Sequence, residues 1–188
     1  MTTKKIIGLS ALLASFSMGA HAANFNYNYG QVGFETGDYE GLVLTGSFDI
    51  NKDMFVLARF ADVTDDSSGV DVDYSEYSIG AGYHMPVNAQ TDGVFTLSFH
   101  SGDAEVDIPF FGTVSDDDTG ILLSAGVRHQ LNPQLELAGN VFHTTIFDGD
   151  TGVYGEVRYN INSKMSAGLN YTSSDAIDGL GINFRMGF

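Results

Sequence analysis

Histidine, serine and carboxylate side chains are the groups in this chain that could support catalysis, so their spacing is the first question. His100 has two serines within two residues of it, and Glu76 is a carboxylate that could orient its ring. Asp71 and Asp73 form an aspartate pair, but no Asp-x-His sequence follows to complete a carboxylate–histidine site. Serines are also expected wherever a strand faces a polar interior. We therefore expect no enzymatic activity.

Carboxylate clusters suggest a second kind of chemistry, the binding of divalent cations. Oxygen-rich groups suit Ca²⁺ or Mg²⁺, and the best candidate ligands are Asp116, Asp117, Asp118, Asp148 and Asp150. The last two lack the bidentate glutamate of an EF-hand loop, and solvated charge is the simpler explanation for both groups. Cysteine is absent, which excludes thiolate metal sites and disulfides. No other cofactor is indicated.

The first residues have the features of a secretory signal peptide. Two lysines precede an apolar run over 6–18, and a small-residue cleavage site ends at Ala22. We therefore expect a cleaved segment over 1–22 and one domain over 23–188. No later segment approaches the roughly 20 apolar residues that a transmembrane helix requires.

Beyond that point, ten segments alternate apolar and polar positions and are separated by turn signals. They run over 24–34, 41–50, 54–64, 72–85, 94–105, 119–131, 135–146, 152–161, 165–173 and 181–188. This pattern predicts an all-β fold, a closed antiparallel up-and-down transmembrane β-barrel with a polar, filled lumen. Eight strands are the alternative count, and a secreted soluble β-sandwich is the alternative fold.

The connections between these segments alternate in length. Tight ones at 51–53, 132–134 and 162–164 alternate with longer acidic ones, and 86–93 is the one long member of the tight set. Because short turns of such barrels face the periplasm, the acidic connections are assigned to the external side. Most of the 24 acidic residues lie there, whereas no basic residue of 23–188 does.

All four arginines fall inside predicted strands, where a charge on the lipid side would cost about 2–4 kcal/mol near the membrane centre. We expect them to point inward and to find partners, since an unpaired buried charge is strongly disfavoured. The predicted lumen network joins Arg59 with Glu76 and His100, Arg128 with Glu136, and Arg158 and Arg185 with Glu156, Asn170 and Asn183. A salt-bridged filling is the simpler role for this network, and a narrow pore that selects small anions is the alternative.

Aromatic residues mark the expected membrane boundaries and the chain end. Tyrosine girdles at the two interfaces are expected from Tyr27, Tyr29, Tyr83, Tyr159 and Tyr171, with a bulge near 30–33. The last eight residues alternate up to the terminal aromatic residue. Phe184, Met186 and Phe188 form their apolar face and are the expected assembly signal.

Short motifs of this chain resemble a known group of proteins. Tyr27-Asn-Tyr29, the run Tyr-Ser-Ile-Gly-Ala-Gly-Tyr over 77–83, the run over 126–133 and the aromatic terminus resemble small outer-membrane β-barrels of a ten-strand type. That type includes vesicle-associated barrels once proposed as secreted elicitors or signal precursors. The resemblance covers most of 23–188. It implies a protein of the outer membrane and its shed vesicles, and it offers no catalytic residue.

The expected partners follow from this location and from the charge. Outer-membrane lipid and lipopolysaccharide surround such a barrel, and Ca²⁺ or Mg²⁺ would bridge its carboxylates to lipopolysaccharide phosphates. The outer-membrane assembly machinery is a second partner, and nucleic acid is excluded by the negative rim. In the longest external connection, 106–118, Phe110 and Phe111 are candidates for a lid or for contact with a surface protein. Two functions remain open, a structural or surface-interaction barrel and a small narrow porin.

Overall fold

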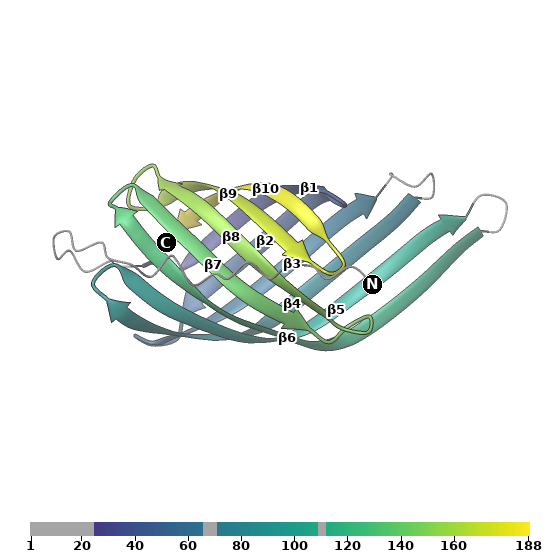
Figure 1. Ribbon diagram of the computed structural model, residues 1–188, viewed down its shortest axis with the longest axis horizontal. Helices are drawn as coiled ribbons and strands as arrows, with labels where there is room; N and C mark the ends of the chain where they lie inside the picture. The colour runs from purple at the N-terminus through teal and green to yellow at the C-terminus, as the bar shows by residue number, and fades with distance from the viewer. Residues whose placement is uncertain (1–24, 66–70, 109–111) are drawn as a thin grey trace, which may run out of the picture.

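Ten antiparallel strands close into one barrel in the computed structural model, which describes residues 25–65, 71–108 and 112–188 (Figure 1). Each strand pairs with its neighbours in the sequence, and the barrel closes where β1 pairs with β10. The predicted fold class is confirmed, with ten strands and not eight. The expected signal peptide over 1–22 lies outside the described residues, as do Phe110 and Phe111.

The strands are β1 (Tyr29–Gly37), β2 (Glu40–Asp49), β3 (Met54–Asp65), β4 (Asp71–Asn88), β5 (Thr91–Ile108), β6 (Gly112–Asn132), β7 (Leu135–Thr144), β8 (Asp150–Asn160), β9 (Met165–Ser174) and β10 (Asp178–Gly187).

Side chains alternate between the two faces of this sheet as the sequence predicts. On β5, Leu97 and Phe99 are 54% and 51% exposed on the outside, whereas Ser98 and His100 are buried inside. The outer surface is therefore apolar and the lumen polar, which is the arrangement of a barrel in lipid. Within the described residues, no helix is long and apolar enough to cross a membrane.

The connections assigned to the periplasmic side are all short, which corrects one prediction. The segment 86–93 was expected to be a long connection, yet β4 continues to Asn88 and β5 begins at Thr91. The register shifts between Pro86 and Asn88, because proline lacks the N–H that a regular ladder requires.

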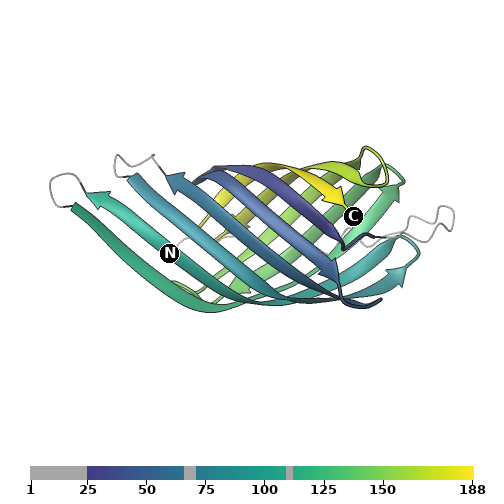
Figure 2. The same cartoon turned by 180° about the vertical axis from the view of Figure 1, so that it is seen from behind.

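The external acidic segments are also mostly strand and not loop. Strands β4, β5 and β6 contain 18, 18 and 21 residues, and β5 pairs with β6 as far as Ile108 and Gly112. The predicted connection 106–118 is therefore the end of a hairpin. Figures 1 and 2 show this hairpin and the β3–β4 hairpin projecting beyond the other strands. Past the membrane both faces of a sheet meet water, so the apolar alternation that predicts a strand is lost there.

The first strand has no bulge, contrary to prediction. β1 pairs without a register shift with both β2 and β10. A Cβ at Gly33 would lie 3.1 Å from the carbonyl oxygen of Ile182, so glycine permits a close approach of β1 and β10 at the closing seam.

The membrane position of this wall is testable with two substitutions on the outward face of β5. Leu97→Arg should lower the free energy of unfolding in lipid vesicles by about 2–4 kcal/mol, because the guanidinium would face lipid. Glu105→Arg, eight residues further along the same face, should change it little because that part of the hairpin projects into water. Equal losses for the two variants, measured by denaturant titration, would contradict this placement.

Candidate functional site

The centre of the lumen is an arginine with four side-chain partners. Arg158 is 2% exposed, and its guanidinium donates to Glu156, to Ser166 Oγ at 3.1 Å and to Asn183 Oδ1 at 2.8 Å. It also donates to Gln31 Oε1, 2.9 Å away on β1. The group that the sequence predicts on β8 and β10 thus comes together, and Gln31 links it across the lumen to the first strand.

A second arginine extends this group. Arg185 donates from Nε to the same Gln31 oxygen at 2.9 Å, and its guanidinium lies 3.9 Å from the ring centre of Tyr29. It is 4.0 Å from the second oxygen of Glu156. Asn170 lies beside Glu156 in the β8–β9 register, but its Oδ1 has no hydrogen-bond partner within the described part of the chain. The structure therefore places Asn170 at this level without bonding that oxygen into the network.

The periplasmic end of the lumen holds a bidentate pair under an aromatic cover. Arg128 donates from Nε to Glu136 Oε1 at 2.7 Å and from Nη2 to Oε2 at 3.2 Å. The guanidinium also lies 4.8 Å from the ring centre of Phe25 and 4.7 Å from that of Tyr27. These two residues belong to the segment 25–28, which precedes β1 and lies inside the barrel, so cation–π contacts hold the segment on the ion pair.

Tyr27 is buried in this segment, which corrects its expected place in a membrane girdle. It is 3% exposed, stacks on His84 at 4.1 Å between ring centres, and donates to Asp92 Oδ2 at 3.2 Å. His84 Nδ1 lies 3.1 Å from the same carboxylate oxygen. Sequence periodicity cannot assign Tyr27 a face, because residues 25–28 lie outside any strand.

The remaining expected girdle tyrosines divide between the two faces. Tyr83, Tyr159 and Tyr171 are 45%, 56% and 47% exposed on the outside. Tyr29 faces the lumen against Arg185, so its assignment to a girdle is also wrong.

A third group lies toward the external end. Arg59 pairs with Glu76 and lies 3.7 Å from Glu35 on β1. His100 Nε2 is 3.1 Å from Glu76 Oε2, and its Nδ1 is 2.8 Å from Thr144 Oγ1 on β7. The predicted trio therefore meets in the lumen. Glu35 on β1 and Thr144 on β7 also reach this group. Hairpin register relates only strands that are neighbours in the sequence, so it could not predict these two contacts.

A connection other than the predicted one covers the external end of the lumen. The β7–β8 connection 145–149 folds inward, where Ile146 is 3% exposed and the Phe147 ring centre lies 6.1 Å from that of Tyr74. Phe147 N donates to Asp118 Oδ2 at 2.7 Å. Phe147 and Asp148 hold φ angles of 49° and 68°, an uncommon conformation that this packing maintains. The expected lid, 106–118, instead forms strand in its described part.

Tyr39 adds a second aromatic ring to this cover from the β1–β2 connection. Its ring centre is 6.2 Å from that of Tyr74, and both rings pack on the buried Val43, Ala61 and Val63. Burial raises the pKa of Tyr39 above its ordinary value, and the carboxylates of Asp65 and Asp38 raise it further. The two rings therefore form an apolar layer next to the Arg59 group, with Tyr74 donating to Glu76 Oε2 at 3.4 Å.

The structure brings the candidate cation ligands together only in part. Asp116 and Asp117 on β6 border the same hollow, whereas Asp118 turns toward the β7–β8 connection and accepts a bond from Phe147 N. Asp148 is exposed, and Asp150 Oδ1 accepts a bond from Asp175 N at 3.2 Å. Among residues 25–65, 71–108 and 112–188, no cluster of three or more histidines and carboxylates is arranged to hold a metal ion.

The projecting part of β6 presents an open sheet edge. Pairing with β7 begins at Leu122, so within the described residues 112–120 is paired on the β5 side only. Ile121 exchanges bonds with Thr145 on the β7 side, and backbone direction alternates along a strand. The N–H and C=O groups of Thr113, Ser115 and Asp117 therefore point to the open edge, whereas the Thr119 N–H donates to Asp118 Oδ1 at 2.7 Å.

Acidic side chains surround this edge. Asp73, Asp103, Glu105 and Asp117 share the outward face of β4, β5 and β6, where they line a hollow of about 270 Å³. No lysine or arginine lies in the projecting part of these strands. The edge therefore combines unpaired backbone groups with a purely negative field.

An apolar exterior, a charged and filled lumen and ten closed strands define a transmembrane β-barrel of the outer-membrane type. The family model described as outer membrane protein beta-barrel domain matches residues 8–156, and the chain belongs to this family.

Among solved structures, the KdgM porin supports the barrel fold. The KdgM porin is 6% identical with a TM-score of 0.52, and the match covers 85% of this chain and 99% of that one. Ail, the attachment invasion locus protein of Yersinia pestis, is 18% identical with a TM-score of 0.48, covering 84% of this chain and 95% of Ail. The N-terminal barrel of Pseudomonas aeruginosa OprF is 12% identical with a TM-score of 0.48, covering 84% and 96%. A comparison with curated protein sequences finds no match.

The central ion pair gives a prediction about stability. Arg158→Ala should lower the free energy of unfolding by about 3–5 kcal/mol, because the buried Glu156 loses its close ion pair and keeps only Asn183 and the more distant Arg185 guanidinium. Lys52→Ala, which removes an exposed pair with Asp53, should cost about 1 kcal/mol or less. Adding Glu156→Gln to Arg158→Ala should restore part of the loss. Denaturant titration of refolded protein measures all three, and no recovery in the double variant would contradict the electrostatic explanation.

Proposed function

We propose that this protein is a non-enzymatic, non-conducting barrel of the outer membrane that binds an extended, basic segment of another protein along the open edge of β6. The observation that carries the proposal is the unpaired edge over 112–117, raised on a projecting sheet and bordered by carboxylates. A surface-interaction role uses these external features, whereas a solute channel would leave them without a purpose.

The open edge supports binding through the backbone. Unpaired N–H and C=O groups along a strand are a template for another extended segment, which adds to the sheet as a further strand. Proteins usually protect such an edge with lysine, proline or a covering element. Here the edge residues from Thr113 to Asp117 are small or acidic, and within the described chain they carry no lysine, proline or covering element.

The charge supports a basic partner. Asp73, Asp103, Glu105 and Asp117 give the surface beside the edge one sign of charge, which speeds encounter with a positive segment and disfavours a negative one. The contact is therefore expected to weaken as salt increases.

Delivery to this location would use the two ends of the chain. The segment 1–22 would direct export, and Phe184, Met186 and Phe188 would be read by the assembly machinery. These three side chains face outward, and the Phe188 ring stacks on Phe48 at 6.5 Å between centres. Vesicles shed from the outer membrane would carry the protein with them.

The lumen supports the absence of a channel and of catalysis. Residues 25–28 occupy its periplasmic end, the arginine groups its middle, and Ile146 with Phe147 and Tyr74 its external end. Thr144, His100 and Glu76 follow the order hydroxyl, imidazole and carboxylate, but the Thr144 and His100 side chains are buried within this filling. A substrate has no access to that hydroxyl.

A narrow porin is the second candidate, because one structural neighbour is a porin and four arginines line this lumen. Planar-bilayer recording of refolded protein separates the two. We expect no conductance steps from the wild type. Arg128→Ala releases the guanidinium that holds the rings of Phe25 and Tyr27, and should introduce steps if that segment is the main obstruction. Regular anion-selective steps from the wild type would overturn the non-conducting assignment.

Binding at the edge is tested with a fluorescent ten-residue peptide of alternating lysine and threonine. Anisotropy should show saturable, salt-sensitive binding to the refolded protein. The double variant Ser115→Pro, Asp117→Pro should weaken it by about tenfold, because two outward N–H donors are lost while the β5 ladder keeps its bonds. Asp148→Asn, which removes a charge away from the edge, is the matched control.

Two results would contradict this proposal. One is equal binding of the peptide by the wild type and the double proline variant. The other is equal binding of a glutamate–threonine peptide. Heat-modifiable gel mobility shows whether each variant is folded.

A further inference from the structure

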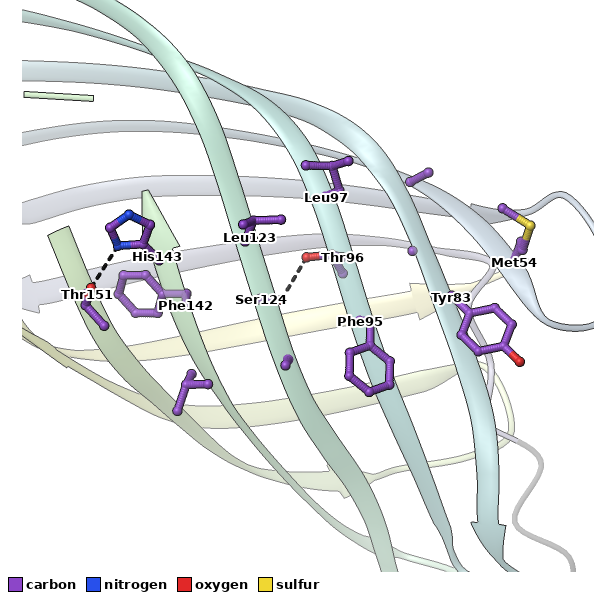
Figure 3. A pocket seen from close by; sticks show the side chains of 14 residues that line it. Met54, Tyr83, Phe95, Thr96, Leu97, Leu123, Ser124, Phe142, His143 and Thr151 are labelled. Atoms are coloured by element: carbon purple, nitrogen blue, oxygen red, sulfur yellow. Dashed lines mark hydrogen bonds between the residues drawn. The ribbon is translucent and has the colours of Figure 1, made fainter. Parts of the chain in front are cut away.

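A hollow of about 600 Å³ lies in the outer wall of the barrel, on the side that faces lipid (Figure 3). It crosses β4, β5, β6 and β7, from Met54 and Tyr83 at one end to His143 and Thr151 at the other. The hollow is open toward the lipid, and its lining is almost wholly apolar.

The hollow exists because small residues interrupt a belt of large ones. Ala81 and Ala125 form its floor, while Phe95, Leu97 and Leu123 stand above them. Gly82 also borders the hollow, but a Cβ there would point into the lumen, 2.1 Å from the Phe55 ring. The depth of the outer hollow therefore comes from the small outward side chains of Ala81 and Ala125.

A polar pair marks one end of the groove. His143 Nδ1 lies 2.8 Å from Thr151 Oγ1, and Figure 3 shows the two side chains bonded across β7 and β8. Both side chains are exposed on the outward face, and each is two residues from an end of the connection 145–149. Within the described part of the chain, the second ring nitrogen of His143 has no hydrogen-bond partner. An imidazole at the external boundary of an apolar wall is thus available to a polar group in the membrane.

We propose that this groove binds one acyl chain of an outer-leaflet lipopolysaccharide, with His143 bonded to the carbonyl group at the head of that chain. The groove is continuous with the lipid-facing belt, so acyl chains are the material that meets it. His143 lies at the external boundary, where the outer leaflet presents its acyl carbonyls. A second copy of the protein is a poorer occupant, because a two-fold contact centred on the hollow would set hollow against hollow and leave the space unfilled.

The first test fills the groove from the outside. Ala125→Phe places a ring on its floor, and Ala167→Phe places the same ring on the outward face of β9, away from it. Native mass spectrometry of protein refolded with lipopolysaccharide of a single chemotype should show one retained lipid on the wild type and on Ala167→Phe. The retained fraction should fall by about tenfold in Ala125→Phe. Equal retention by the two variants, or no retained lipid on the wild type, would overturn the proposal.

The second test uses a matched histidine. His129 Nδ1 lies 2.8 Å from Thr91 Oγ1 in a similar outward pair, near the periplasmic end of β5 and β6. His143→Leu should remove the preference for lipopolysaccharide over a phosphatidylethanolamine of similar chain length, and His129→Leu should keep it. Equal retention of the two lipids by the wild type would overturn the assignment to lipopolysaccharide. A dimer mass without lipid would assign the groove to a second copy instead.

Discussion

The high cost of a charge facing lipid is the constraint on which this structure depends. All four arginines lie in membrane-spanning strands, and a guanidinium on their outer face would cost about 2–4 kcal/mol near the membrane centre. They therefore point inward, where an unpaired charge is also costly, and each must meet a carboxylate. Glu35, Glu76, Glu136 and Glu156 are the carboxylates that serve this purpose, on four different strands.

This pairing makes the interior a connected unit. Gln31 accepts bonds from Arg158 and Arg185, so β1 is tied to β8 and β10 through the lumen as well as through the backbone. The same arginine chemistry holds the segment 25–28, because the Arg128 guanidinium lies against two of its rings. The residues that pair charges inside the barrel thus also fill its lumen.

The outer surface divides into three zones along the strands β4 to β6. In the membrane zone, large apolar side chains such as Phe99 and Ile121 meet lipid, and small ones such as Ala125 leave the groove. Beyond it, the same face becomes acidic at Asp103 and Asp117, where the sheet projects into water. The last zone is the open edge of β6, which exists because β7 ends far sooner than β5 does. A difference in hairpin length therefore creates the main external feature of the molecule.

The sequence alone determined the fold class and the arginine pairs between neighbouring strands, since period-two alternation and hairpin register are local properties. It placed Arg128 beside Glu136 for this reason. Only the tertiary structure decided that Tyr27 enters the lumen, that Gln31 and Thr144 join networks from distant strands, and that 106–118 extends a hairpin. Barrel closure brings distant residues together, and exposure to water removes the need for apolar alternation. Neither effect leaves a periodic pattern in the chain.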